Sequence, residues 1–124
     1  HEMAGSEALS MVSGWSGPEA VRADKGSSGA WSIGPRSRVV IDLGGMRPST
    51  LLIRGRYFEG NRRTRVFANG NDLGWHDLSQ PQRIGLPPGA GPALDIELEH
   101  EAPRQPGPHD LRPLALYLTE ITLR

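Results

Sequence analysis

Three tryptophans are the side chains in this sequence best suited to hold a ligand: Trp15, Trp31 and Trp75. An indole ring that stands beside a groove can stack on the apolar face of a sugar and bury a large area. The alternative for each ring is packing within the protein. Trp31 opens an apolar segment and is expected to face the core, whereas Trp15 stands in a glycine-flanked loop.

Three charged residues, Glu19, Asp110 and Arg112, are predicted to join Trp15 and Trp31 in a ligand-binding site. Carboxylate and guanidinium groups form hydrogen bonds with sugar hydroxyls. A structural alternative is equally open: Glu19 and Arg112 form an ion pair that joins the first long loop to the last strand, and Asp110 caps the loop turn. Under both readings Glu19 and Arg112 lie within salt-bridge reach. Asp110 is then close by, and Trp15 or Trp31 packs beside the pair.

The sequence predicts no catalytic residue, no metal site and no cofactor. Cysteine is absent, which excludes disulfides, zinc ribbons and thiol catalysis. None of the four histidines has the spacing of a metal motif, and no glycine-rich loop has the strand-to-helix context of a phosphate site. We therefore expect no enzymatic activity within this chain. A carboxylate pair in a groove, which a hydrolase would require, is not apparent.

Charge and hydropathy exclude two further classes of partner. The formal net charge is zero, with 14 basic and 14 acidic residues, so the basic footprint of a nucleic-acid-binding protein is missing. No apolar run approaches the roughly 20 residues of a membrane-spanning helix, so direct membrane insertion is not expected.

The elements that position these residues show a period of two, which is typical of half-buried β-strands. Leu94–His100 is the clearest case, with Leu94, Ile96 and Leu98 alternating with three acidic residues. We expect this strand to be central in the sheet, with its acidic face matched by basic neighbours. The candidates for those neighbours are Arg54, Arg56 and Arg65.

Turn signals divide the chain into about eight short strands. Glycine contributes 16 residues and proline 11, and Asn69-Gly70 is suited to a type I′ hairpin. Two longer connections cover 14–29 and 101–113. This pattern predicts an all-β fold, an antiparallel β-sandwich with a jelly-roll connection. Residues 1–12 are expected to combine a cloning remnant with a lead-in strand, and residues 13–124 to form the single domain.

The last apolar segment shifts phase by one residue. Leu116 and Leu118 share one face, and so do Ile121 and Leu123, but three positions separate Leu118 from Ile121. A β-bulge near Thr119-Glu120 would keep both pairs in the core. An amphipathic helix is the alternative, which the β-branched residues disfavour.

Several short motifs, taken in order, resemble a β-sandwich accessory domain found on bacterial cell-surface polysaccharide glycosyltransferases and on membrane phosphoglycerol transferase-like proteins. The resemblance covers about residues 13–124. It departs from the family pattern at 20–29, where this chain has a longer loop, and at Ala115, where glycine is usual. The motifs that carry it are Gly14-Trp15-Ser16-Gly17-Pro18-Glu19, Trp31-Ser32-x-Gly34, Val66-Phe67-Ala68-Asn69-Gly70, Leu86-Pro87 and Asp110-Leu111-Arg112-Pro113-Leu114-Ala115-Leu116.

The resemblance implies a non-catalytic carbohydrate-binding or substrate-positioning module of a bacterial polysaccharide-synthesis enzyme. Its partners would be a carbohydrate or the catalytic domain of the host enzyme, within a larger protein of the cell envelope. The alternative is a docking or dimerisation domain of a glycosyltransferase. An exposed apolar patch or pairing through an open sheet edge would favour that alternative.

Overall fold

The computed structural model describes residues 9–16, 29–88 and 91–124. All regular elements in these ranges are β-strands, and no helix long and apolar enough to cross a membrane is found there. The nine strands are β1 (Leu9–Ser13), β2 (Ala30–Trp31), β3 (Arg36–Asp42), β4 (Thr50–Tyr57), β5 (Thr64–Ala68), β6 (Asn71–His76), β7 (Gln82–Gly85), β8 (Ala93–His100) and β9 (Leu116–Leu123).

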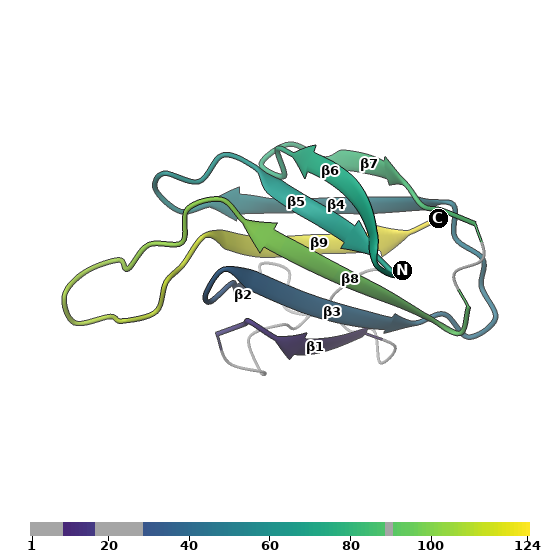
Figure 1. Ribbon diagram of the computed structural model, residues 1–124, viewed down its shortest axis with the longest axis horizontal. Helices are drawn as coiled ribbons and strands as arrows, with labels where there is room; N and C mark the ends of the chain where they lie inside the picture. Colours follow the sequence, from purple (N-terminus) through teal and green to yellow (C-terminus); the bar gives the residue numbers. More distant parts are fainter. Residues whose placement is uncertain (1–8, 17–28, 89–90) are drawn as a thin grey trace.

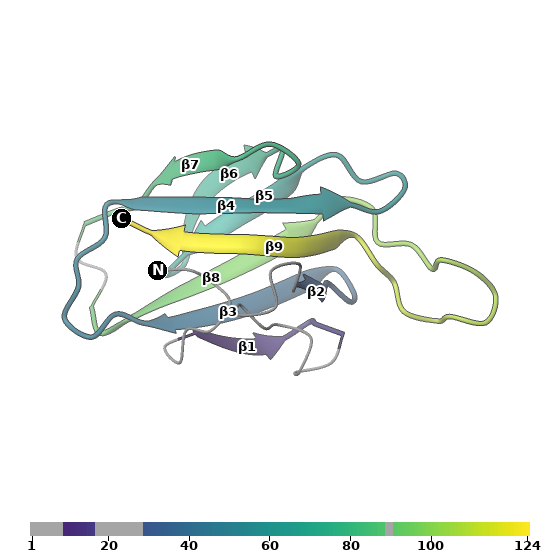
Figure 2. The same ribbon diagram turned by 180° about the vertical axis from the view of Figure 1, so that it is seen from behind.

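The strands form two antiparallel sheets that pack face to face (Figures 1 and 2). The larger sheet has the order β1-β3-β8-β5-β6, and the smaller sheet has the order β2-β9-β4-β7. From β2 onward, each strand joins the sheet opposite its predecessor, except in the β5–β6 hairpin. This alternation is the jelly-roll connection, so the predicted fold class is confirmed.

The β5–β6 hairpin has the predicted turn. Ala68 pairs with Asn71, which leaves Asn69 and Gly70 as a two-residue loop. Both loop residues have positive φ, 49° at Asn69 and 83° at Gly70. Type I′ geometry requires this combination, and glycine adopts it without steric cost.

Strand β8 is central in the larger sheet, as predicted. It pairs with β3 on one side and β5 on the other. Its inward side chains, Leu94, Ile96 and Leu98, are buried with exposures of 1% or less. They meet the inward leucines and isoleucines of β4 and β9 in one continuous core.

The basic neighbours of the acidic β8 face differ in part from those predicted. Arg36 bonds to Glu97 at 2.9 Å and to Glu99 at 3.2 Å, and Arg38 bonds to Asp95 at 2.6 Å. Both arginines lie on β3, which pairs directly with β8.

The prediction of Arg54 and Arg56 is wrong because β4 belongs to the opposite sheet. Arg65 does lie opposite Glu99 in the β5–β8 register. Its guanidinium, however, bonds to Asp72 of β6.

The phase shift at the C-terminus is a β-bulge, as predicted. Arg54 pairs with Glu120 and Gly55 pairs with Leu118, so Thr119 is the extra residue on β9. Its hydroxyl donates to the carbonyl of Arg54 at 3.2 Å. Both Leu118 and Ile121 consequently point into the core, with exposures of 0% and 1%.

A long arm, residues 101–115, extends from one end of the sandwich between β8 and β9 (Figures 1 and 2). Its two sides are held together by two backbone hydrogen bonds between Arg104 and Leu114, each 2.8 Å long. A second bridge joins Gly107 to Asp110 nearer the tip. The arm therefore has a defined path, which places the region of Asp110 and Arg112 at this end of the molecule.

Candidate functional site

Three segments that are distant in sequence lie side by side where the arm meets the sandwich. The amide of Ser16 donates to the carbonyl of Trp31 at 2.9 Å, and the amide of Gly34 donates to the carbonyl of Pro113 at 2.9 Å. Ser32 joins Leu116 through both its amide and its buried hydroxyl, at 2.8 and 2.9 Å. Three of the motif segments noted in the sequence, around residues 14–16, 31–34 and 110–116, thus form one surface.

Asp110 and Arg112 form a bidentate ion pair on this surface. The Arg112 Nε donates to Asp110 Oδ1 at 2.8 Å, and Nη2 donates to Oδ2 at 2.5 Å. The backbone amide of Arg112 also donates to Oδ1, at 3.1 Å. These donors, the guanidinium foremost, lower the pKa of Asp110 to about 2. The carboxylate is therefore ionised throughout the physiological range.

The pair is fixed in place and open to solvent. Arg112 Nη1 donates to Ser16 Oγ at 2.7 Å, which ties the arm to the segment after β1. The side chains of Arg112 and Asp110 are 45% and 32% exposed. Arg112 uses three of its five N–H groups in these bonds. A ligand with hydroxyl groups therefore meets both donors and acceptors at a held position.

Trp15 adjoins this pair through Ser16, but it also has a structural role. Its Nε1 donates to the carbonyl of Arg38 at 3.0 Å, and its half-buried ring packs against the core. The backbone of Trp15 forms an isolated bridge with Ser32. The tryptophan therefore holds the end of β1 against both sheets.

Trp31 does not face the core. The neighbouring positions Ala30 and Ser32 are both buried at 0% exposure, and the period of two turns Trp31 to the outer side of the smaller sheet. There its ring lies 6.0 Å from the ring of Phe58, edge to face, and 5.1 Å from the ring of Tyr117. The result is a half-buried aromatic cluster outside the sandwich interior.

The structure brings together Asp110 and Arg112, and it places the segments of Trp15 and Trp31 beside them. Glu19 lies outside the described residues, so its expected pairing with Arg112 stays a prediction. The partner that sequence reasoning missed is Ser16, whose hydroxyl was inconspicuous in a glycine-flanked segment. Within the described ranges, no three His, Asp or Glu side chains gather closely enough to ligate one metal ion.

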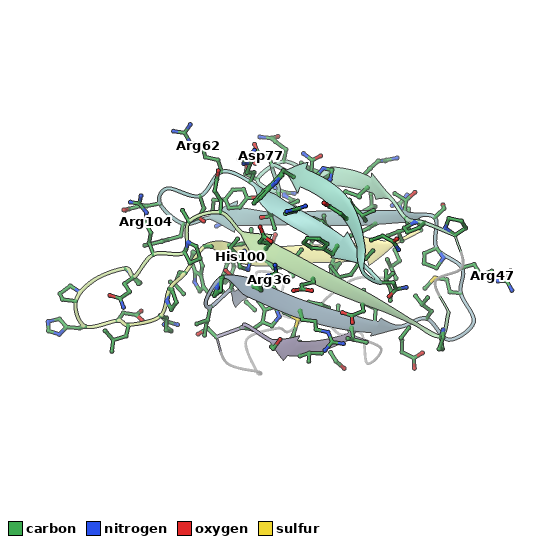
Figure 3. The ribbon with its side chains drawn as sticks, viewed as in Figure 1. Arg36, Arg47, Arg62, Asp77, His100 and Arg104 are labelled. Atoms are coloured by element: carbon green, nitrogen blue, oxygen red, sulfur yellow. The ribbon has the colours of Figure 1, made fainter. Side chains whose placement is uncertain are left out.

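The two ends of the molecule differ in character. Arg104 marks the base of the arm, and Arg47 stands at the opposite end (Figure 3). A hollow of about 700 Å³ at that opposite end is lined chiefly by prolines, glycines, Met46 and Leu86. Arg47 is the charged residue in its wall. The hydroxyl-binding chemistry described above therefore belongs to the arm end.

No protein-family model matches the chain, and no curated protein sequence matches it. Among solved structures, a family 35 carbohydrate binding module from an environmental isolate aligns with a TM-score of 0.51 and 12% identity. The alignment covers 100% of this chain and 92% of that one. This likeness shows a shared fold.

Two further solved structures align at lower scores. The tandem CBM51 modules of Sp3GH98, the family 98 glycoside hydrolase from Streptococcus pneumoniae SP3-BS71, give a TM-score of 0.46 at 8% identity, over 99% of this chain and 44% of that one. The CBM36-1 domain of a multidomain xylanase from the hindgut metagenome of Trinervitermes trinervoides gives a TM-score of 0.45 at 13% identity, over 98% of this chain and 97% of that one.

Proposed function

We propose that this chain is a non-catalytic carbohydrate-binding module whose ligand binds at the arm end. The observation that carries the proposal is the exposed Asp110–Arg112 pair, held by Ser16 beside the segments of two tryptophans. A sugar hydroxyl both donates and accepts, so it can bond to the carboxylate and the guanidinium together. Because the pair is already ordered, binding loses little side-chain entropy.

The fold supports the same function. The solved structure that aligns with a TM-score of 0.51, over 92% of its own length, is a carbohydrate binding module. Fold alone does not determine function, so the site chemistry is the stronger support. The resemblance of the motifs extends the proposal to its setting: the module would position polysaccharide for a bacterial synthesis enzyme of the cell envelope.

The test is binding of the chain to immobilised bacterial and plant glycans, followed by calorimetric titration of every glycan retained. We expect Arg112→Ala to weaken binding about tenfold or more, because the variant loses the guanidinium and releases Asp110. Arg47→Ala is the matched control, since Arg47 lies at the other end of the sandwich. Glycan binding that is unchanged by Arg112→Ala would remove this site from the proposal.

A second candidate function, docking to the catalytic domain of a host enzyme, is favoured by Leu111. This leucine is 72% exposed, between Asp110 and Arg112 on the arm. An aliphatic side chain has neither a polar group for sugar hydroxyls nor a flat ring for stacking, so it suits an apolar contact with protein better than a sugar contact. Leu111→Ser separates the two functions: it should abolish docking if the arm binds protein, and it should leave glycan affinity unchanged if the ion pair binds sugar.

A further inference from the structure

A β-bulge in β6 turns Trp75 onto the outer face of the larger sheet. In the β5–β6 register, Arg65 pairs with Trp75 and Phe67 pairs with Asp72, so β6 has one residue more than β5 in this interval. The extra residue lies at Leu73-Gly74, where Gly74 has φ +88°, a conformation that favours glycine. Leu73 still packs against the core, while Trp75 two positions later is 37% exposed.

Trp75 stands beside a fixed pair of charges. The guanidinium carbon of Arg63 lies 4.6 Å from the centre of the indole ring. Arg63 Nε donates to Glu101 Oε2 at 3.1 Å, and the other oxygen of Glu101 accepts the backbone amide of Arg62 at 3.1 Å. The ring, the guanidinium and the carboxylate are therefore held together at the junction of β6, the β4–β5 loop and the arm.

The same chemistry continues along the sheet. Arg65, which pairs with Trp75 across the strands, places its guanidinium carbon 5.1 Å from the ring centre of Phe67. It also forms an ion pair with Asp72. The surface around Trp75 thus presents two aromatic rings, each next to an arginine that is paired with a carboxylate. We name this set of Arg63, Arg65, Phe67, Asp72, Trp75 and Glu101 the Trp75 surface.

The composition of the Trp75 surface selects among ligands. Each arginine is matched by a carboxylate, so the surface offers no excess charge to an anionic or cationic polymer. Its rings are separated by charged groups, so it is not a continuous apolar patch of the kind that docks a protein. Arg63 lies over one face of the indole, and Trp75 is 37% exposed, so the exposed part of the ring is what a ligand can contact. A neutral pyranose fits this arrangement, because its apolar face can stack there while its hydroxyls bond to the paired charges.

We propose that the Trp75 surface is a second carbohydrate-binding site, specific for neutral pyranose chains. The inference rests on the proposed function of the chain but not on the same residues. Trp15 bonds to β3, and β3 and β6 are three strand positions apart, about 14 Å. The arm-end pair is held by Ser16 after β1, whereas the Trp75 surface lies mainly on β5 and β6, so each site can be tested without changing the other.

The experiment is a titration of the uniformly ¹⁵N-labelled chain, read at its three indole N–H resonances. The probes are cellohexaose, mannohexaose and xylohexaose as neutral chains, with an oligogalacturonide and a chitosan oligomer as charged comparisons. We expect a neutral chain to shift the Trp75 resonance, assigned through Trp75→Phe, and Trp75→Ala to weaken binding of that chain about tenfold. Met46→Ala is the matched control, because Met46 is also 37% exposed but lies in the opposite loops.

The outcomes separate this inference from the proposed function. If a neutral chain binds, leaves the Trp75 resonance unmoved and is unaffected by Trp75→Ala, the second-site proposal is overturned. The arm-end site is then judged separately, by the effect of Arg112→Ala on the same binding. A shift of Trp75 by the charged oligomers alone overturns the assignment to neutral sugars. If no probe binds and glycan arrays are silent, both proposals fail. Since the resonance readout uses the unmodified chain, poor folding of Trp75→Ala would not obscure the result.

Discussion

His100 ends β8 as a buried imidazole with a defined tautomer. The hydroxyl of Ser37 donates to the carbonyl of Gly14 at 2.7 Å, so it accepts the second bond, 2.8 Å long, from His100 Nε2. Nε2 therefore has the proton, and Nδ1 is a bare acceptor. Nδ1 is buried and has no hydrogen-bond partner among the described residues. Burial lowers the pKa of His100 to about 4.

This lowered pKa makes the stability of the chain depend on pH. Between about pH 6.5 and pH 4 the unfolded state binds a proton at His100 that the folded state does not, so stability falls as the pH falls through this window. The expected loss from this residue is about 3 kcal/mol. The measurement is the free energy of unfolding from urea titrations at a series of pH values.

Two histidine variants isolate the effect. His100→Gln should flatten this part of the pH profile, because the titrating group is gone. His109→Gln should retain it, since His109 is exposed on the arm. An unchanged slope in His100→Gln would contradict the assignment.

At the residue scale, the sequence led us to expect Asp110 close to Arg112, with a turn-capping role as one alternative, but it did not predict the ion pair between them, since Arg112 was assigned to Glu19. Asp110 and Arg112 are two positions apart, and such spacing lets an aspartate bond to the following backbone amide, as it does here. The prediction that Trp31 faces the core was wrong. It followed from the large apolar ring, but the inward positions of this strand are occupied by small residues. Ala30 and Ser32 fill the inner positions next to β9.

At the scale of the element, the two bulges differ in how visible they are in the sequence. The bulge in β9 shows as a phase shift between two apolar pairs, so it could be predicted. The bulge in β6 is hidden because Leu73 and Trp75 keep an apparent period of two, although they lie on opposite faces. The bulge is revealed by the register with β5 and by the positive φ of Gly74, and both come from the structure.

The bulge in β9 predicts the outcome of a deletion. Removing Thr119 restores one-to-one pairing with β4, because Leu118 still pairs with Gly55 and Glu120 with Arg54. Every inward side chain stays inward. We expect this deletion to change the free energy of unfolding by no more than about 1 kcal/mol. Urea denaturation of the purified variant measures it.

Deletion of Thr122 is the matched control. This deletion brings Leu123 next to Ile121, and the one-residue slip turns Leu123 to the outer face. In the unmodified chain Leu123 is only 4% exposed. The expected loss is about 2–3 kcal/mol, the value for exposing a buried leucine. Equal losses of unfolding free energy for the two deletions would show that the bulge stabilises the fold in some way other than by keeping the register.

At the scale of the whole molecule, the sequence predicts the fold class but not the assignment of strands to sheets. Alternating apolar residues and turn signals indicate a sandwich, but the same pattern is compatible with many different strand pairings. Which sheet a strand joins depends on crossovers, and in this chain nearly every connection crosses. The basic neighbours of β8 were misassigned for this reason, since Arg54 and Arg56 lie on β4 of the other sheet.

The same connectivity predicts slow folding. Ala30 pairs with Leu118 and Val39 pairs with Ile96, so most sheet contacts close long loops. Among the strands that the structure describes, only the β5–β6 hairpin is local. Loop closure costs entropy before the distant contacts form. We expect refolding in milliseconds to seconds, measured by stopped-flow tryptophan fluorescence. Because closure entropy grows only slowly with loop length, shortening the arm between Arg104 and Leu114 should change the rate by less than about threefold. Refolding within microseconds would contradict the prediction and point to a nucleus made of local contacts.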